Sequence, residues 1–326
     1  MLITRTPLRI SIGGGGTDLA SYYSRHGGFV ISAAIDRHVY IAINRTFTDD
    51  YFLKYAALER VSGIDEIEHP IIRTALQLHP IGPSLEIVSV ADIPAGTGLG
   101  SSGTFTVGLL RALHAYKREP VTPGDLAEEA CHIEIDRLDR PAGKQDQYIA
   151  SFGGITCFQI EPNGRVHVSP LNISTSTLHD LEEHLLMFFT GYSRHAEELL
   201  HDQRERTEAG DETMIEALRA VEQVGVQIRA ALEDGDTAAF GGLMHEHWLR
   251  KRERAQGMSR PEIDDAYAAA IATGAIGGKL TGAGGGGFLV LYASDPKALR
   301  KKMSELGLPE VRFGFDHDGS TLLVRE

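Results

Sequence analysis

The chain has 326 residues, of which 42% are apolar and 24% are charged, so it is long enough for a full hydrophobic core and more consistent with two domains than with one. Its formal net charge of -13 argues against a binder of nucleic acids or of anionic membranes, because such proteins carry a basic field. Any anionic ligand must therefore be held by local groups.

The cysteines and the amino terminus bear on the cellular compartment. Cys131 and Cys157 lie in helical or apolar contexts without a CxxC spacing, which predicts neither a disulfide framework nor a zinc site. Residues 1–16 lack the basic segment and long apolar core of a secretion signal, and no apolar run reaches membrane length. We therefore expect a cytoplasmic protein with no membrane partner.

Residues 6–12 are the first expected strand. Leu8, Ile10 and Ile12 alternate with polar residues, which places them on one face of the strand and Arg9 on the other. The strand runs into four consecutive glycines.

The remaining elements mix strands and helices in both halves of the chain. Two strands are expected at 27–35 and 38–47, joined at the polar corner Asp36-Arg37, and another at 84–90. A helix is expected from Asp125 to Leu138, and a buried strand around 184–191 precedes long helical stretches. Late strands are expected at 287–293 and 320–326.

The segment "IPAGTGLGSSGT" (93–104) joins the strand at 84–90 to a helix that begins near Ser102. It is not a Walker A loop, which needs Ser or Thr directly after a Gly-Lys pair. The pairs Gly143-Lys144 and Gly278-Lys279 are followed by Gln145 and Leu280 instead. The glycines match GxGxxG, but Pro94 separates them from the strand, so a dinucleotide site is only weakly supported. A protein-kinase glycine loop is also excluded, because the sequence has no VAIK-like strand after the loop and no HRD motif.

Two interpretations of this loop stay open. Its backbone N–H groups and the hydroxyls of Ser101 and Ser102 could face an anion at the helix N-terminus, or its glycines could serve only a tight connection. Two further glycine tracts, at 10–19 and 278–292, let the backbone approach a ligand closely. Three such tracts are difficult to explain by turns alone.

Acidic residues near these tracts are candidate catalytic groups. Glu134 falls in the middle of the apolar face of the expected helix, so it needs a cation, a partner or a proton. It could be a metal ligand or form an internal salt bridge, for example with Arg137. Asp146, close to Lys144, and Asp18 could each be a helix cap or a functional carboxylate.

Together these motifs resemble the GHMP small-molecule kinases, which include galactokinase, homoserine kinase, mevalonate kinase and phosphomevalonate kinase. "PLRISIGGGGTD", "PAGTGLGSSGT" and "KLTGAGGGGF" are similar to the three family motifs in the right order, and the interval from Glu134 to Asp146 matches the family's acidic pair. Gly15-Gly16 stands where galactokinases have Glu-His, which argues against galactose. The amino-terminal motif is most similar to that of bacterial kinases of D-glycero-D-manno-heptose 7-phosphate, and fucokinases are more distant.

The resemblance implies an α+β protein of two domains with the site in the cleft between them. Residues 1–180 would form an ATP-binding domain like ribosomal protein S5 domain 2, and residues 181–326 a ferredoxin-like domain. The ATP phosphates would lie on Pro94, Gly96, Gly98, Leu99, Gly100, Ser101, Ser102 and Gly103.

The resemblance also implies roles for the acidic and basic residues. Ser102 and Glu134 would hold Mg²⁺, Asp146 would be the catalytic aspartate, and Arg9 would lower its pKa and stabilise charge on the transferring group. Positioning and electrostatics could supply most of the acceleration. Substrate contacts would come from Gly15, Gly16, Thr17, Asp18, Arg140, Lys144, Asp146, Gly154, Thr281, Gly282, Ala283 and Gly284.

The implied reaction is ATP-dependent phosphorylation of the anomeric hydroxyl of the heptose 7-phosphate, for GDP-heptose supply to lipopolysaccharide or capsule. Alternatives are an anomeric kinase of an unphosphorylated sugar, a non-catalytic sugar and ATP sensor, and a nicotinamide-dependent oxidoreductase. The helical second half offers surfaces for a homodimer without requiring one. Candidates for binding the acceptor phosphate are Arg25, His26, Arg37, Arg140, Lys144 and Arg194, with Arg140 and Lys144 preferred because they flank the acidic pair.

Overall fold

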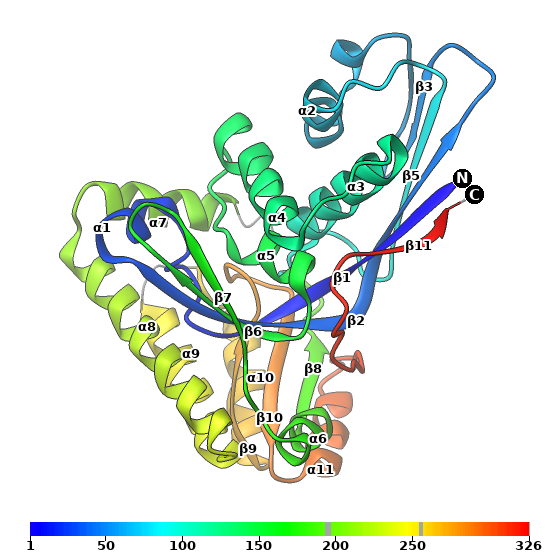
Figure 1. Cartoon of the computed structure of the whole chain (residues 1–326). Helices are drawn as coiled ribbons and strands as arrows, with labels where there is room; N and C mark the ends of the chain where they lie inside the picture. Colours follow the sequence, from blue (N-terminus) through cyan, green and yellow to red (C-terminus); the bar gives the residue numbers. More distant parts are fainter. Residues whose placement is uncertain (193–196, 254–256, 326) are drawn as a thin grey trace.

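The computed structural model describes residues 1–192, 197–253 and 257–325 and contains two sheets with helices against both (Figure 1). The larger sheet has eight strands in the order β11-β1-β2-β5-β3-β4, and β6 and β7 extend it from β2. The pairing is antiparallel except between β3 and β5. The strands are β1 (Leu2–Gly13), β2 (Gly28–Arg45), β3 (Tyr51–Lys54), β4 (Leu58–Val61), β5 (Leu85–Ala91), β6 (Ile155–Ile160), β7 (Val166–Pro170) and β11 (Thr321–Arg325).

Strand β1 has the predicted two faces. Leu8, Ile10 and Ile12 are buried in the core, whereas Arg9 points to the opposite side of the sheet. Apolar alternation therefore sets the side on which Arg9 lies.

Strand β2 corrects one prediction. The residues expected to form two strands make one strand of 18 residues, and Asp36 and Arg37 lie within it. In the pairing with β1, Pro7 lies opposite His38 and Leu8 opposite Ile35, so the polar pair is bulged out of the ladder. The sequence signal for a corner marks a bulge instead.

Helices cover the larger sheet. Helices α3, α5 and α8 contact β1 and β2, and α4 packs on α3 and α5. Figure 1 shows α3, α4 and α5 grouped together, with α2 near the far end of β3 and β5. These helices are α1 (Ala20–His26), α2 (Pro70–Leu78), α3 (Ser101–Lys117), α4 (Pro123–Cys131), α5 (Gln145–Phe152) and α8 (Glu212–Glu233), with a 3₁₀ turn at Ile64–Glu66.

The smaller sheet has three antiparallel strands in the order β8-β10-β9. An isolated bridge between Phe188 and Glu310 adds a rudimentary fourth strand beside β8. With its helices this gives the β-α-β-β-α-β sequence of a ferredoxin-like domain, so the predicted α+β class is confirmed. The elements are α6 (Thr175–His184), β8 (Leu185–Phe189), α7 (Glu197–Glu208), α9 (Thr237–Glu253), α10 (Pro261–Ala272), β9 (Ala275–Leu280), β10 (Phe288–Ala293) and α11 (Pro296–Glu305).

The last strand does not follow the expected division at residue 180. Residues 320–326 were expected with the carboxy-terminal half, but β11 pairs with β1 of the larger sheet, and the two chain ends lie together in Figure 1. Such pairing between chain ends has no local sequence signal. Among the described residues, no helix combines the length and the apolar character needed to cross a membrane.

Candidate active site

A cavity of about 730 Å³ lies where the two sheets meet. Its wall combines the end of β1, the loop before α3, the start of α5, helices α7 and α9, and the loop after β9. All three glycine tracts of the sequence therefore contribute to one wall.

Arg9 and Asp146 form a two-pronged ion pair at this cavity. Arg9 Nε donates to Asp146 Oδ1 at 2.7 Å and Nη2 donates to Oδ2 at 2.9 Å. The Arg9 side chain is only 6% exposed, whereas that of Asp146 is 28% exposed. Such bidentate pairs fix orientation as well as charge, so Asp146 is held with one edge toward the cavity.

Arg9 also joins the ion pair to the glycine loop. Its Nη1 donates to the carbonyl of Gly98 at 2.6 Å, and its backbone N–H donates to the carbonyl of Leu99 at 3.0 Å. Gly103 packs on Asp146 so closely that a Cβ there would lie 2.8 Å from Asp146 Cβ. The loop, the base of α3 and the carboxylate are thus one packed unit.

The N-terminus of α3 opens into the same cavity. Gly100 is in the left-handed region with φ 77°, and the first turn of α3 contains no acidic residue. In the described part of the chain, Ser101 Oγ is buried without a hydrogen-bond partner. Free N–H groups, the helix dipole and an unsatisfied hydroxyl fit an anionic group such as phosphate.

Glu134 lies beside this helix N-terminus and is 1% exposed, as its position on the apolar face predicted. Ser102 Oγ donates to Glu134 Oε1, and Gln147 Nε2 donates to Oε2 at 2.8 Å. The salt-bridge partner is Arg140 at 3.4 Å, and not the suggested Arg137. Burial raises the Glu134 pKa and the Asp146 charge adds to this, against the lowering effect of Ser102, Gln147 and Arg140.

The local backbone explains how Glu134 reaches Ser102. The expected single helix over 125–138 consists of α4 followed by a π-helical turn at His132–Arg137. This wider turn changes the angular spacing of its side chains, and such turns are frequent at functional sites. The carboxylate and hydroxyl of Glu134 and Ser102 are hard oxygen donors, so the pair fits Mg²⁺.

Asp18 is a second carboxylate on the cavity wall. Its Oδ1 accepts from the Gly16 N–H at 3.0 Å and its Oδ2 from the Gln145 N–H at 3.1 Å. Burial raises its pKa, as does the charge of Asp146, while the backbone hydrogen bonds oppose the rise. The carboxylate is therefore fixed in direction and placed near Asp146.

The structure brings most of the predicted substrate residues to the cavity wall but not all. Gly15, Gly16, Asp18, Arg140, Asp146, Thr281, Gly282, Ala283 and Gly284 line it, as do Arg9, Glu134, Gly96, Gly98, Gly100, Ser101 and Ser102. Pro94, Leu99 and Gly103 lie outside the described lining, where Leu99 is core and Gly103 supports Asp146.

Three of the predicted substrate residues are not among the described residues that line the cavity, namely Thr17, Lys144 and Gly154, and their role in substrate binding stays a prediction. The Thr17 hydroxyl donates to the Phe29 carbonyl at 3.0 Å and is fully buried. The Lys144 ammonium donates to both oxygens of Glu128, at 2.9 and 3.0 Å, in a separate surface pocket. The Gly154 N–H donates to the carbonyl of Asp316. Each residue is used inside the fold.

Of the candidates for binding an acceptor phosphate, Arg140 lines the cavity. Arg194 lies outside the described residues. Arg25, His26 and Arg37 lie outside the described lining, and Arg37 donates to Asp36 instead.

Several wall residues had no sequence signal. Lys251 on α9 donates to the carbonyls of Leu280, at 3.1 Å, and Gly282, so it supports the carboxy-terminal glycine tract. Its "LRKRE" context looks like a solvated basic run, yet Lys251 is 7% exposed. At the other end, the His69 ring lies 4.6 Å from Tyr55 and 5.0 Å from Phe105, centroid to centroid, and the three rings form an aromatic wall. Other unpredicted lining residues are Gln203, His247, Met258 and Lys279.

Comparison with known proteins gives consistent matches over both sheets. Residues 69–154 match the GHMP kinases N terminal domain and residues 228–307 match the GHMP kinases C terminal domain. A D-glycero-alpha-D-manno-heptose 7-phosphate kinase of Campylobacter jejuni subsp. jejuni serotype O:2 is 31% identical, over 92% of this chain and 93% of the relative. The L-fucokinase/L-fucose-1-P guanylyltransferase of Bacteroides fragilis is 26% identical over 92% of this chain but 36% of its own length. The crystal structure of a D-glycero-D-manno-heptose 1-phosphate kinase from Bacteriodes thetaiotaomicron has a TM-score of 0.81 and 25% identity, and the match covers 100% of both chains.

Proposed function

The chain belongs to the GHMP kinase family, and from this premise we propose that it transfers the γ-phosphoryl group of ATP to the anomeric hydroxyl of D-glycero-D-manno-heptose 7-phosphate. The products would be the heptose 1,7-bisphosphate and ADP. The observation that carries this proposal is Asp146, held by Arg9 with one edge toward the cavity, beside the open N-terminus of α3.

The nucleotide would lie along the wall from the aromatic residues to α3. The rings of Tyr55, His69 and Phe105 suit a flat base, which gains from stacking and burial. The phosphates would accept hydrogen bonds from the first N–H groups of α3 and from Ser101 Oγ. Because the whole protein is acidic, this local cluster of donors would provide most of the attraction for the phosphates.

A magnesium ion would be held by Ser102 and Glu134. Burial raises the pKa of Glu134, so a bound cation would restore the charged form of this carboxylate. When bound, the ion would neutralise charge on the β- and γ-phosphates. Ser102 and Arg140 already bond to the same carboxylate oxygen, so they orient it toward the phosphate site.

Asp146 would act on the acceptor. Its cavity-facing edge can accept the proton of the anomeric hydroxyl as the oxygen attacks phosphorus, while Arg9 fixes the carboxylate and balances its charge. Asp18, oriented by two backbone N–H groups, would bind sugar hydroxyls nearby. Together these groups place the nucleophile beside the phosphate, which is the main requirement of phosphoryl transfer.

The choice of acceptor rests on the Campylobacter relative, which is named a heptose 7-phosphate kinase. The structural relative is named a heptose 1-phosphate kinase, and a fucokinase is also similar. Arg140 supports a phosphorylated acceptor as a basic residue on the wall. The product would then enter GDP-heptose formation for a surface polysaccharide, in the cytoplasm.

The test is ADP release with Mg-ATP across heptose 7-phosphate, heptose 1-phosphate, free heptose, mannose, mannose 6-phosphate, fucose and galactose. We expect the highest kcat/KM with heptose 7-phosphate, and phosphorus NMR should show a new anomeric phosphate. Preference for an unphosphorylated sugar would contradict the proposed acceptor but not the proposed mechanism of phosphoryl transfer. ATP binding without turnover on any acceptor would favour a sensor.

A further inference from the structure

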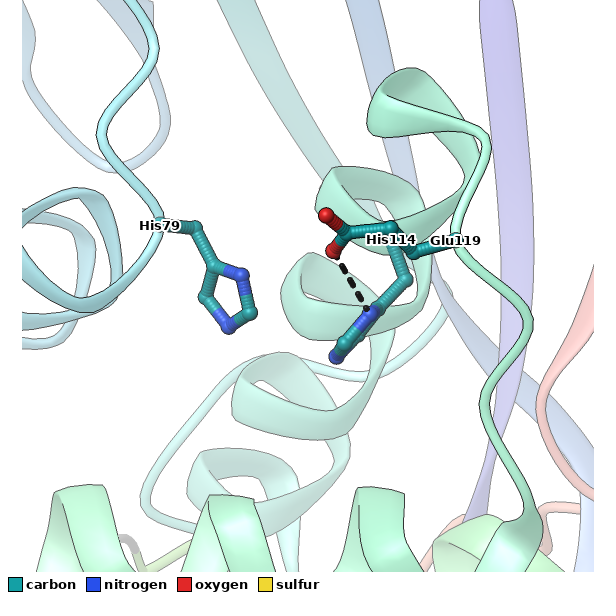
Figure 2. A group of neighbouring side chains, drawn as sticks. All are labelled: His79, His114 and Glu119. Atoms are coloured by element: carbon teal, nitrogen blue, oxygen red, sulfur yellow. Dashed lines mark ion pairs between the residues drawn. The ribbon is translucent and has the colours of Figure 1, made fainter.

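A polar cluster lies at the C-terminal end of α3, opposite the end that opens into the cavity (Figure 2). It consists of His79 at the end of α2, His114 and Lys117 in the last turn of α3, Glu119 just after it, and Glu129 on α4. We call these five residues the histidine cluster. It joins three successive helices, α2, α3 and α4.

Glu129 binds both histidines from one side. His114 Nε2 is 2.8 Å from Glu129 Oε2, and His79 Nε2 contacts Oε1. A hydrogen bond to a carboxylate places the ring proton on Nε2 of each histidine, so the lone pair of each Nδ1 faces another partner.

The Nδ1 atoms lie on the side of Glu119. A ring nitrogen from each histidine and an oxygen of Glu119 lie within 4.8 Å of one another. His114 Nδ1 is 3.7 Å from Glu119 Oε2, and in the described residues this buried nitrogen has no hydrogen-bond partner. Figure 2 shows the His79 ring facing the pair formed by His114 and Glu119.

Lys117 shows that this space suits a cation. Its ammonium is 2.8 Å from Glu119 Oε2 and 3.3 Å from His79 Nδ1. The Lys117 side chain is 27% exposed and ends a flexible stem, so it can turn toward water. A dication of the right chemistry could therefore replace it.

We propose that the histidine cluster is a binding site for a divalent transition metal of the zinc type. The ligands are His79 Nδ1, His114 Nδ1 and a Glu119 oxygen, which leave one position for water. Two imidazoles and one carboxylate favour zinc, cobalt or nickel over magnesium and calcium. Glu129 would orient the two rings, because a histidine bound to a metal usually donates the N–H of its second ring nitrogen to a carboxylate.

Metal binding would tie α2 to α3 and α4. The start of α2 carries Pro70 and Ile71 of the cavity wall, beside His69. A metal at the other end of α2 would hold this wall in place, and it would raise the unfolding temperature because it binds only the folded arrangement.

The experiment uses the untagged full chain after removal of metal with a chelator. Cobalt(II) titration followed by visible absorption and zinc titration by calorimetry should give one saturable site. His114→Ala should abolish it. Lys117→Met should bind about tenfold more tightly or better, because it removes a competing positive charge. Glu129→Gln should weaken binding by about 10- to 100-fold.

The matched control is His132→Ala, since His132 is an exposed histidine paired with Asp136 on the π-helical turn. It should bind metal as the unsubstituted chain does. The proposal is overturned if the unsubstituted chain shows no saturable site, or if His114→Ala and His132→Ala bind equally. Binding by Lys117→Met alone also overturns it, because Lys117 is then the resident cation.

Discussion

The two ends of α3 present side chains of opposite kinds. Its N-terminus presents Ser101, Ser102 and free N–H groups to the cavity, whereas its last turn presents His114 and Lys117 to Glu119. The helix dipole favours anions at the first end and cations at the second. One helix would therefore provide both the proposed phosphate site and the proposed cation site.

The ends differ also in how they are encoded. The site at the N-terminus of α3 includes one continuous glycine-rich segment, and the backbone conformation of this segment depends on neighbouring residues in the sequence. The histidine cluster draws on α2, α3 and α4. Substitutions at one end should leave the other intact, and the predictions below test this separation.

The largest effect is expected from Asp146→Asn, which removes the proposed proton acceptor near the N-terminus of α3. Turnover should fall by about 10²- to 10⁴-fold with ATP binding retained. Steady-state ADP release together with nucleotide titration would measure both. Asp136→Asn is the control, since this carboxylate is 65% exposed and pairs with His132. Near-normal turnover in Asp146→Asn would remove it from the proposed role.

Gly103→Ala should disturb the same end through packing. The new Cβ would lie 2.8 Å from Asp146 Cβ, so unfolding free energy should fall by about 1–3 kcal/mol and kcat should fall with it. Urea unfolding and turnover give the two values. Gly242→Ala is the control, because it also lies in a helix and its Cβ would enter open space. Equal stability of the two variants would contradict the packing argument.

Glu134→Gln should raise the magnesium concentration needed for half-maximal rate by about tenfold or more, because it removes the charged oxygen of the proposed magnesium ligand. Cobalt binding at the histidine cluster should not change. A magnesium titration that matches the unsubstituted chain would mean that Glu134 serves only the salt bridge with Arg140.

The smallest effect is on stability without magnesium. Burial raises the pKa of Glu134, so its share of stability is present below its ordinary pKa of 4.5 and is lost as pH rises toward the folded-state pKa. Glu134→Gln should therefore gain stability relative to the unsubstituted chain as pH rises from 4 to neutrality. Urea unfolding across this range measures it, and a constant difference would contradict the shift.

Local sequence patterns correctly predicted the features that depend on the order of neighbouring residues alone. The two faces of β1 and the burial of Glu134 follow from apolar periodicity. The hydrogen bonds of Thr17 and Lys144 could not be predicted from periodicity, because their partners, Phe29 and Glu128, come from other elements of the fold. The sequence shows a threonine and a lysine near the motifs but not what already occupies their polar groups.

Contacts between distant segments could not be predicted for a related reason. Strand β11 looks like any late strand, and only its pairing with β1 assigns it to the larger sheet. Lys251 looks solvated until α9 packs against the glycine tract after β9. Their places depend on contacts between distant segments, which periodicity does not encode.

The most direct test of the account is a crystal structure of the Asp146→Asn variant with Mg-ATP and heptose 7-phosphate. We predict the γ-phosphate over the N-terminus of α3, and the anomeric hydroxyl within hydrogen-bond distance of the side chain at position 146. A sugar whose anomeric carbon points away from that side chain, or phosphates bound elsewhere, would contradict it.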